Sequence, residues 1–390
     1  MTDDVTDIPV DIDQADHSPL EGSRPMVCLY HRNCADGLAS LIVAQAAHEL
    51  YRKHFISVGE FHSIAMQYGR RTDFTSPELA PLLYNADVYI LDFSLSKEEM
   101  DQLRSVCSSV TMIDHHASAA RVWGGYRTFD DEAVAPSMGD DPKDWRCFMR
   151  VKIDDSCCGA QLAYDYFKST CANIVEDSEL TTARFYHPNM PVMCAHVNDY
   201  DLWNWHLPDT GAWNLLLRDG KLPKDPLQFT AELDEITDLI FGEPAIFNKE
   251  LERCVQLHKQ HVDTCRRYAH KAQACELMGQ DATIVNIPAD YTNHTAEALK
   301  AIHPGRVIIC WSASTDTVNV SLRQSNGLQR DLSQLAERFG GGGHKNAAAF
   351  SISPSRLPKL LAGDLRPSWM QSLRAIKRSL KTFMLGEPQP

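Results

Sequence analysis

Residues 110–116 read VTMIDHH, a short apolar run that ends abruptly in a carboxylate and two imidazoles. Two earlier apolar runs end in a similar way. MVCLY at residues 26–30 continues into HRNCAD, and VYIL at residues 88–91 is followed by Asp92. Because ligands of an open parallel sheet bind at the carboxyl ends of its strands, we expect these polar side chains to meet at one edge of a sheet.

The surrounding pattern predicts the fold class. Short apolar runs alternate with segments of helical periodicity along residues 26–205, as in a parallel sheet flanked by helices. Residues 124–150 are rich in proline and aspartate and predict an insertion or long loop, whereas residues 246–275 predict one long helix. Three strand-like runs, a short helix and a glycine run follow. The sequence therefore predicts an α/β protein: a parallel-sheet domain joined by a helical linker to a smaller α/β C-terminal domain.

Composition limits the function classes. The chain has 390 residues, of which 44% are hydrophobic, and this is ordinary for a globular protein. A formal net charge of −14 disfavours a broad electrostatic grip on long duplex nucleic acid. The acidic first 25 residues lack the features of a signal peptide, and no run approaches a membrane span. No membrane partner is therefore expected. Twelve scattered cysteines without a CxxC pair favour a reducing, cytoplasmic compartment.

The residue types at the strand ends suit a metal centre. Imidazoles and carboxylates that converge at one sheet edge are suitable ligands for two divalent ions such as manganese. Asp92, alone at the end of its run, is the candidate bridge between two ions. Asp199 and Asp201, in the segment HVNDYDLW, can place a further carboxylate at the same edge. Candidates from the first and third runs are His31, Cys34, Asp36, Asp114, His115 and His116.

Each candidate also has a structural alternative. Asp92 can simply cap a helix that begins near Ser96, and His31 can be a satisfied turn histidine. Asp36 can cap the helix that follows it, with Gly37 allowing the tight bend. The joint occurrence of these residues at successive strand ends is what favours the metal centre.

At this point the sequence resembles the DHH phosphoesterases, specifically those with a DHH-associated C-terminal domain. Four segments match in order, HRNCADG, LDFS, IDHH and NDYDLW, and VSLR followed by DLSQLAERFGGGGHKNAAAF matches in the C-terminal part. The resemblance covers residues 26–352. It implies a two-metal hydrolase of phosphoanhydride or phosphodiester bonds, with the active site in the cleft between the domains.

The resemblance also implies roles for single residues. His116 is expected to face the scissile phosphate, and Asp114 to orient a ligating histidine. Cys34 stands where many members carry an aspartate, which leaves the composition of one metal site open. No role is implied for Asp201. The implied metal ligands are His31, Cys34, Asp36, Asp92, His115 and Asp199.

The C-terminal motif is expected to bind the substrate. Glycines let backbone N–H groups approach a phosphate closely, and Arg323 and His344 can donate charged hydrogen bonds to it. The alternative is a glycine turn that ends the preceding helix at Phe339. The expected substrate-binding residues are Arg323, Gly341, Gly342, Gly343 and His344.

Together these expectations give a function and a domain division for the whole chain. The preferred function is metal-dependent hydrolysis of a short oligonucleotide or nucleotide phosphodiester, with two manganese ions and magnesium as the alternative metal. A polyphosphate or pyrophosphate hydrolase and a catalytically weak nucleotide-binding protein stay open, as does a homodimer. We expect a disordered acidic tail at 1–25, a DHH catalytic domain at 26–205, a helical linker at 206–279, a substrate-binding domain at 280–363 and a C-terminal tail at 364–390.

Overall fold

The structure, a computed structural model, divides into two compact units, Met1–Val255 and Gln256–Pro390. Most of the two predicted tails and most of the predicted insertion at 124–150 lie outside the described residues, and the predicted domain boundaries stay predictions. The structure describes residues 23–54, 58–68, 70–124, 147–171, 183–219, 229–343 and 345–367.

The first unit is built on a five-stranded sheet in the order β2-β1-β3-β4-β5. All four strand pairs are parallel, which confirms the predicted fold class. The apolar runs that the sequence showed are the three inner strands. The five strands are β1 (Arg24–His31), β2 (Val58–Met66), β3 (Asp87–Leu91), β4 (Ser109–Asp114) and β5 (Phe148–Ile153).

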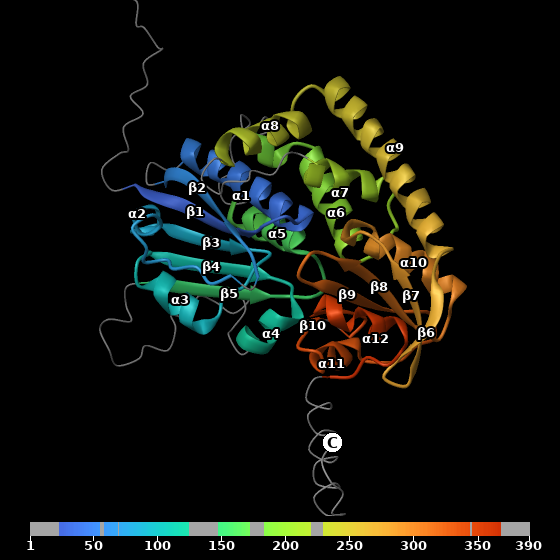
Figure 1. Ribbon diagram of the computed structural model, residues 1–390. Helices are drawn as coiled ribbons and strands as arrows, with labels where there is room; N and C mark the ends of the chain where they lie inside the picture. The colour runs from blue at the N-terminus through green and yellow to red at the C-terminus, as the bar shows by residue number, and fades with distance from the viewer. Residues whose placement is uncertain are drawn as a thin grey trace, which may run out of the picture. The chain divides into compact units, whose positions relative to one another are not determined.

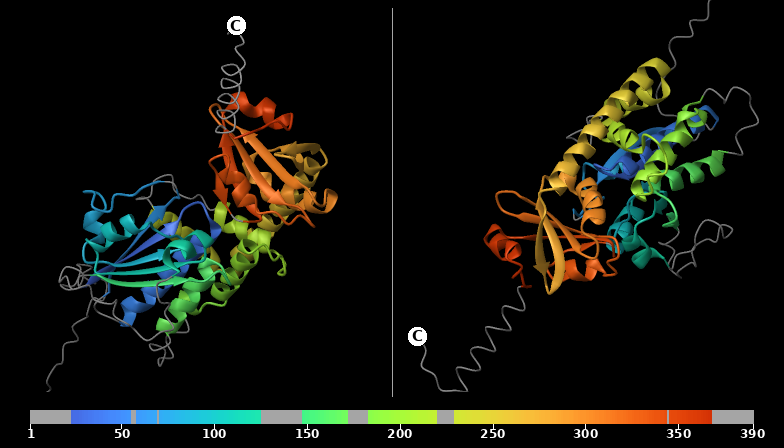
Figure 2. Two further views of the ribbon diagram at one scale, coloured as in Figure 1. Left: turned by 90° about the horizontal axis from the view of Figure 1, so that it is seen from below. Right: turned by 90° about the vertical axis from the view of Figure 1, so that its right-hand side faces the viewer.

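Helices cover both faces of this sheet, with α1 and α5 on one face and α3 and α4 on the other (Figures 1 and 2). Alternate residues of β1 enter the two cores: Cys28 packs with the first set of helices, and Leu29 packs with the second. The helices of this unit are α1 (Ala35–His54), α2 (Ala80–Leu83), α3 (Lys97–Arg104), α4 (Ala117–Trp123), α5 (Gly159–Cys171), α6 (Asn189–Asp201), α7 (Thr210–Asp219) and α8 (Phe229–Phe241).

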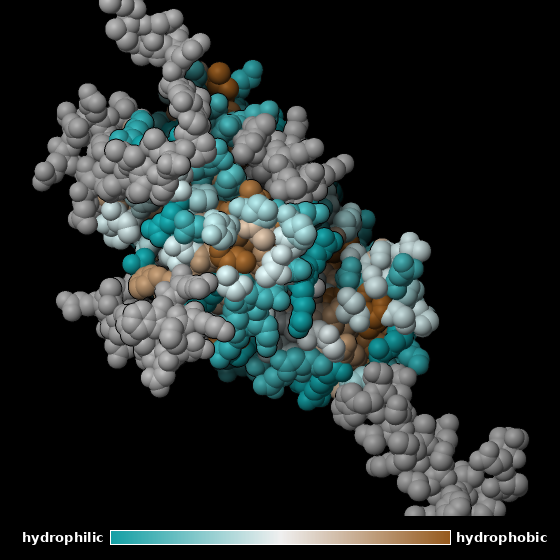
Figure 3. All heavy atoms as spheres, turned by 90° about the vertical axis from the view of Figure 1, so that its left-hand side faces the viewer, coloured by the Kyte–Doolittle hydropathy of each residue, from teal (hydrophilic) through white to brown (hydrophobic). Residues whose placement is uncertain are grey.

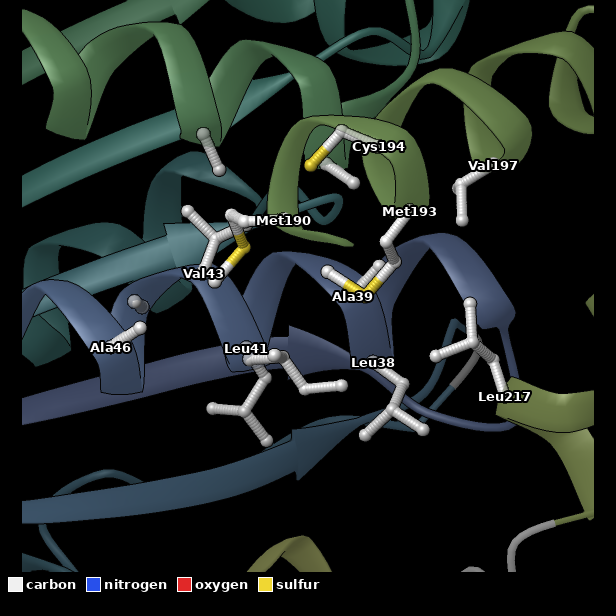
Figure 4. Close-up of a cluster of buried hydrophobic side chains, with 14 of the residues drawn as sticks. Leu38, Ala39, Leu41, Val43, Ala46, Met190, Met193, Cys194, Val197 and Leu217 are labelled. Atoms are coloured by element: carbon white, nitrogen blue, oxygen red, sulfur yellow. The ribbon is translucent and has the colours of Figure 1, made fainter. Parts of the chain in front are cut away.

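Helix α1 is apolar around almost its whole circumference, which is the pattern of a helix enclosed by other elements. Figure 4 shows why: Ala39 and Val43 of α1 face Met190 and Met193 of α6, whereas Leu38 and Leu41 point to the other side of the helix and are buried there. This packing fixes the N-terminus of α1, and with it the turn at residues 31–36, against the end of α6. The candidate ligands on that turn are thus held by the largest core of the unit.

The second unit contains a six-stranded sheet in the order β10-β11-β9-β8-β7-β6, in which only the β7–β8 pair is parallel. Helix α10 packs on one face, and α11 and α12 pack on the other (Figure 1). The elements are β6 (Gln273–Leu277), β7 (Gln280–Asn286), α10 (Thr292–Ile302), β8 (Val307–Ala313), β9 (Val318–Gln324), α11 (Leu332–Glu337), β10 (Gly342–Gly343), β11 (Ala347–Ile352) and α12 (Leu357–Leu361).

Two predicted element boundaries are wrong. The long helix expected at 246–275 is α9 (Pro244–Ala269), and it stops before β6, whose Cys275 pairs with Ala282 of β7. Residues 148–150, assigned to the insertion, belong to β5. In both cases pairing with a neighbouring strand, β7 for β6 and β4 for β5, determines the structure of a segment whose own pattern is weak.

On the face drawn in Figure 3, hydrophilic residues predominate and apolar residues form small separate spots. Exposed large apolar side chains include Tyr84, Ile246 and Leu361. Scattered exposed apolar residues of this kind are normal on a protein surface. Among the described residues, no helix is both long enough and apolar enough to cross a bilayer.

Candidate metal centre

The carboxyl ends of β1, β3 and β4 meet at one edge of the first sheet. Strand register places Tyr30 beside Leu91, and Leu91 beside Ile113. The next residue on each strand is therefore His31, Asp92 or Asp114, and these three follow one another across the sheet. The sequence pattern predicted this convergence, and the parallel register is its physical cause.

Asp92 lies at the centre of the cluster, and three imidazoles surround its carboxylate. Its oxygens lie 3.3 Å from Nδ1 of His31, 3.2 Å from Nε2 of His115 and 3.8 Å from Nδ1 of His116. Burial alone would raise the pKa of Asp92, but His115 and His31 outweigh burial and hold the pKa well below its usual range. Asp92 is thus an anion at neutral pH.

The alternative role of Asp92 as a helix cap is not what the structure shows. Ser96 caps α3 and forms a complete capping box with Glu99. Asp92 itself has a φ of 53°, in the left-handed region that few non-glycine residues adopt, while its N–H donates to the carbonyl of Ile113. Unusual backbone geometry of this kind occurs frequently at functional sites.

Asp36 is anchored by the N-terminus of α5. Its carboxylate accepts hydrogen bonds from the N–H groups of Gly159, at 2.7 Å, and Ala160, at 2.6 Å. It therefore binds the start of α5 rather than capping α1. Its Oδ2 also lies 3.5 Å from Nε2 of His115. Burial, followed by the carboxylates of Asp92 and Asp201, raises the pKa of Asp36 well above its usual value.

Gly37 and Asn33 shape the turn that carries Asp36. A Cβ on Gly37 would lie only 2.1 Å from the carbonyl oxygen of His31, so no larger residue fits there. The left-handed residue of the turn is Asn33, with a φ of 58°. Gly37 is thus required because the backbone of His31 comes close to it. The bend that we expected at Gly37 is made at Asn33 instead.

Asp114 is fully buried and orients the residue two positions further on. Its Oδ1 accepts from the backbone N–H of His115 at 2.8 Å and lies 2.7 Å from Nδ1 of His116. Because the carboxylate is the acceptor, we assign the proton to Nδ1 of His116. Burial lowers the pKa of His116, but the bond to Asp114 outweighs burial and the net shift is upward.

The expected ligand Asp199 lies outside the cluster. Its carboxylate accepts from the N–H groups of His206 and Leu207 and from the hydroxyl of Thr210, at 2.8, 3.1 and 2.7 Å. It therefore organises the loop between α6 and α7. Asp201 lies in the cluster instead, with Oδ2 3.6 Å from Nε2 of His115. Two residues apart on a helix, the two side chains point in nearly opposite directions, so only one can face the sheet edge.

Cys34 lies at the same edge. The ligand atoms of His31, Cys34 and Asp92 lie within 4.8 Å of one another. Burial, followed by the carboxylates of Asp92 and Asp36, raises the pKa of the Cys34 thiol well above its usual value. Without a bound cation the side chain is therefore a neutral thiol at physiological pH.

The donor set fits divalent cations. Oδ1 of Asp92 is buried and, although Nε2 of His115 lies 3.2 Å away, forms no well-aligned hydrogen bond with any described residue; Oδ2 of Asp114 likewise forms none. Buried carboxylate oxygens without donors are costly unless a cation or water satisfies them. Three groups of ligand atoms, each within 4.8 Å, share members: Asp92–Asp114–His115–His116, His31–Cys34–Asp92 and Asp36–His115–Asp201.

Sequence reasoning gave no role to two residues that shape the centre. Tyr68 packs edge-on against His31 and His116, with ring centroids 5.2 and 5.5 Å apart. It follows β2, whose carboxyl end lies at the same sheet edge, so recognition of that strand would have pointed to it. Gly159 lets α5 approach Asp92 and Asp36, and no local pattern marks it.

The expected substrate-binding residues of the second unit have internal partners. Arg323 donates to Oδ1 of Asn293 at 2.7 Å and to the carbonyl of Leu322. Cβ atoms on Gly341 and Gly343 would meet the carbonyl oxygens of Ala349 and Ala347, at 2.0 and 2.6 Å. Gly342 pairs with Ala349, and His344 lies outside the described residues. Their binding of a substrate stays a prediction.

The glycine turn that was the alternative is also present, at Gly340. This residue has a φ of 82°, and its N–H donates to the carbonyl of Glu337, while Gly341 donates to that of Ala336. Such bonds close the C-terminus of a helix. The first two glycines of the run thus end α11, and the last two form β10.

Comparisons with known proteins agree with this architecture. Residues 282–363 match the DHHA1 domain family. An uncharacterized protein from Acanthamoeba polyphaga mimivirus is 22% identical over 334 residues, which cover 84% of this chain and 67% of that protein. The solved DHH domain of a member of a ribosomal-protein family has a TM-score of 0.54 and 15% identity, with 88% of this chain and 86% of that chain covered.

A third similar protein is RecJ from Thermus thermophilus, solved in complex with Mn²⁺. Its TM-score is 0.48 at 13% identity, with 89% of this chain and 52% of that chain covered. The C-terminal part of the chain thus matches the DHHA1 domain family, and the fold is similar to that of a solved DHH domain. The family match confirms the C-terminal part of the resemblance inferred from the sequence motifs, and the fold agrees with the remainder.

Proposed function

We propose that this protein is a metal-dependent phosphoesterase that hydrolyses a short phosphorylated substrate, with a short oligonucleotide or nucleotide phosphodiester as the preferred class. One observation carries the proposal. The buried carboxylate of Asp92 is surrounded by three imidazoles, and its Oδ1 forms no well-aligned hydrogen bond with any described residue. This arrangement suits a carboxylate that bridges two cations.

The residues that would hold two divalent ions follow from the three overlapping groups. Asp92 is shared by the first two groups, and His115 by the first and third. We assign Asp201 as a ligand in place of Asp199, because the Asp199 carboxylate accepts hydrogen bonds from the α6–α7 loop and from Thr210. Bound divalent ions supply positive charge to phosphate oxygens and lower the pKa of water. Manganese is the preferred metal, because the donors are mainly oxygen and imidazole.

His116 is the candidate for direct contact with the phosphate. Asp114 fixes the proton on Nδ1 and leaves Nε2 to face away from the carboxylate. The raised pKa favours the protonated ring, which can donate a hydrogen bond to a phosphate oxygen on which negative charge develops. Tyr68 packs against the ring and limits its orientations.

The proposal is tested with a substrate panel. Purified protein is assayed with dinucleotides, cyclic dinucleotides, adenosine bisphosphate, pyrophosphate and polyphosphate, each with manganese and with magnesium. We expect the nucleotide phosphodiesters to be hydrolysed fastest. Faster hydrolysis of pyrophosphate or polyphosphate would show that these compounds, and not phosphodiesters, are the substrate class. Binding of a nucleotide without hydrolysis of any substrate would show that the protein is a nucleotide-binding protein.

The role of Asp92 is tested by Asp92→Asn. The amide keeps the shape but removes the charge shared by two ions, so activity should fall by roughly three orders of magnitude or more, in line with losses of central electrostatic groups. Asp101→Asn, an exposed change on α3, is the matched control. Retention of more than about a tenth of the wild-type activity in Asp92→Asn, at unchanged metal content, would contradict the assignment.

A further inference from the structure

Two cysteines that have no role in the metal centre are in contact at the amino ends of β4 and β5. Sγ of Cys107 lies 3.6 Å from Sγ of Cys147, although the two residues are 40 positions apart in the chain. Cys107 comes shortly before β4, and Cys147 comes directly before β5. The parallel register pairs Ser109 with Phe148 at the start of the two strands. Strand pairing therefore brings the two thiols together.

This pair of thiols is remote from the metal centre. The candidate ligands follow the carboxyl ends of the strands, whereas Cys107 and Cys147 lie at the amino ends. Among the described residues, no third histidine, cysteine or carboxylate forms a ligand group with the two sulfurs. A structural metal site generally needs four ligands, so the pair is better suited to form a bond than to hold an ion.

The hydrogen bonds of the pair give the two thiols different roles. Sγ of Cys147 donates to the carbonyl of Phe148, so it accepts from the thiol of Cys107. The Cys107 thiol and the nearby Arg104 guanidinium outweigh burial and lower the pKa of Cys147. The bond to Cys147, together with burial, raises the pKa of Cys107. Because the thiolate is the reactive form of cysteine, Cys147 is the nucleophile of the pair.

The surroundings of the pair allow a small oxidant to reach it and the sulfurs to come closer. Cys107 and Cys147 are each 5% exposed, whereas Cys28 and Cys194 in the core have no exposed surface. A disulfide bond is about 2.05 Å long, so the sulfurs must approach further to form one. In the described part of the sheet β5 is an edge strand that pairs with β4 alone, so a small shift of its first residue disturbs no other strand.

We propose that Cys107 and Cys147 are a redox-active dithiol, which a peroxide converts into a disulfide between the starts of β4 and β5. The Cys147 thiolate attacks one oxygen of hydrogen peroxide, the O–O bond breaks, and the hydroxide that leaves takes up a proton and becomes water. The product is a sulfenic acid at Cys147. The sulfur of Cys107 then attacks the sulfur of Cys147 while its proton passes to the departing oxygen. The S–S bond forms, the S–O bond breaks, and a second water leaves. The two thiols lose two electrons in total, and the peroxide gains them.

The disulfide stabilises the folded state. It closes a loop between residues 40 positions apart and so restricts the unfolded chain more than the folded one. We therefore expect the oxidised protein to unfold at a temperature roughly 5 °C above that of the reduced protein. In a reducing compartment the pair stays a dithiol until an oxidant is present, which is usual for cysteines that sense redox conditions.

The test treats the full-length protein with a small excess of hydrogen peroxide. The remaining thiols are blocked with iodoacetamide, and the protein is digested without reduction for mass spectrometry. We expect a pair of peptides joined between Cys107 and Cys147, a loss of two of the twelve thiols, and the higher unfolding temperature. Dithiothreitol should reverse all three changes. None of these readouts depends on hydrolytic activity, so the result is independent of the proposed function.

Single variants separate the roles of the two cysteines. Cys107→Ser should accumulate the sulfenic acid at Cys147, seen as a dimedone adduct, without a disulfide. Cys147→Ser should leave Cys107 reduced. Cys275→Ser, at a more exposed cysteine of the second unit, is the control and should form the disulfide as the wild-type protein does.

The wild-type measurement decides the proposal even if a variant fails to fold. Absence of the joined peptides after peroxide treatment would overturn it, whether other cysteines are oxidised or none is. A dimedone adduct at Cys107 of Cys147→Ser would contradict the order of attack. A disulfide that leaves the unfolding temperature unchanged would contradict the expected stabilisation.

Discussion

A Cβ atom on Gly159 would lie 2.7 Å from the Cβ of Asp92, closer than side chains approach one another. The same atom would lie 3.2 Å from Oδ2 of Asp36, which accepts the N–H of Gly159. The first residue of α5 therefore packs closely against two candidate ligands. This contact links the packing of a core helix to the geometry of the metal centre.

Gly159→Ala should disturb the centre without removing any ligand. The added methyl group must displace Asp92 or the start of α5, and such overpacking costs about 1–3 kcal/mol of unfolding free energy. We expect a lower thermal midpoint and weaker manganese binding by calorimetry. Ser169→Ala, an exposed change on the same helix, is the control. Unchanged manganese affinity in Gly159→Ala would show that the centre tolerates a shift of α5.

Asp199→Asn and Asp201→Asn should have opposite consequences. Asn at position 199 weakens bonds to two backbone N–H groups and one hydroxyl, and we expect it to destabilise the fold by about 1–3 kcal/mol. Manganese binding should survive.

Asn at position 201 removes a charge that faces His115 and Asp92, so manganese binding should weaken while the unfolding midpoint changes little. Denaturant unfolding and calorimetry on both variants separate the two effects. The reverse pattern would restore Asp199 as the ligand.

The stability of the metal-free protein should fall as pH rises from about 6.5 to about 10. Burial lowers the pKa of His115, but Asp92, Asp36 and Asp201 outweigh burial and raise the pKa to about 10. A raised folded-state pKa contributes stability that is complete below the unfolded value of about 6.5 and is lost as pH passes the folded value. Asp92 is ionised in the folded and the unfolded state across this range, so it does not contribute to the pH dependence of stability.

Bound manganese should remove this slope, because a ligating imidazole must be unprotonated. The measurement is urea unfolding at several pH values between 6 and 10, with chelator and with manganese. His115→Gln provides the control, since it should reduce the pH dependence in chelator and leave the part contributed by His116 and Cys34, whose pKa values are also raised. A metal-free protein whose stability rises over this range would contradict the electrostatic description of His115.

The sequence predicted the inner part of the sheet better than its edges. The strands β1, β3 and β4 are covered on both sides by helices and neighbours, so they are continuous apolar runs. The edge strands are VGEFHSIAM in β2 and FMRVKI in β5, in which polar residues interrupt the pattern. Without β2, the position of Tyr68 could not be anticipated.

The candidate site, like the sheet, could be predicted only in part. Residues directly after the predicted strands could be placed at one edge from the parallel topology alone. Asp199 and Asp201 lie on a helix whose rotation about its axis depends on packing against α1, and the sequence does not determine that rotation. The contact of Gly159 with Asp92 joins segments 67 residues apart in the chain. Only tertiary packing brings them together.

Cys34 gives the centre a ligand position of unusual chemistry. The thiol lies with His31 and Asp92 in one group of ligand atoms, yet burial and the neighbouring carboxylates keep it protonated. A neutral thiol supplies no charge, so an ion held by that group has fewer anionic ligands than one beside an aspartate. A thiolate would instead favour softer metals such as zinc. The raised pKa favours the first case.

Cys34→Asp should therefore tighten binding of a second manganese ion, seen in calorimetry as a stronger second event, because it adds an anionic oxygen ligand. Cys34→Ser replaces one neutral group with another and should leave both events near their wild-type values. Cys28→Ser, at a buried cysteine of β1 outside the ligand groups, controls for the loss of a thiol. If zinc binds wild-type protein far more tightly than Cys34→Ser, the thiol ionises on metal binding. If Cys34→Asp binds manganese with the stoichiometry and affinity of wild-type protein, Cys34 does not contribute to the metal centre.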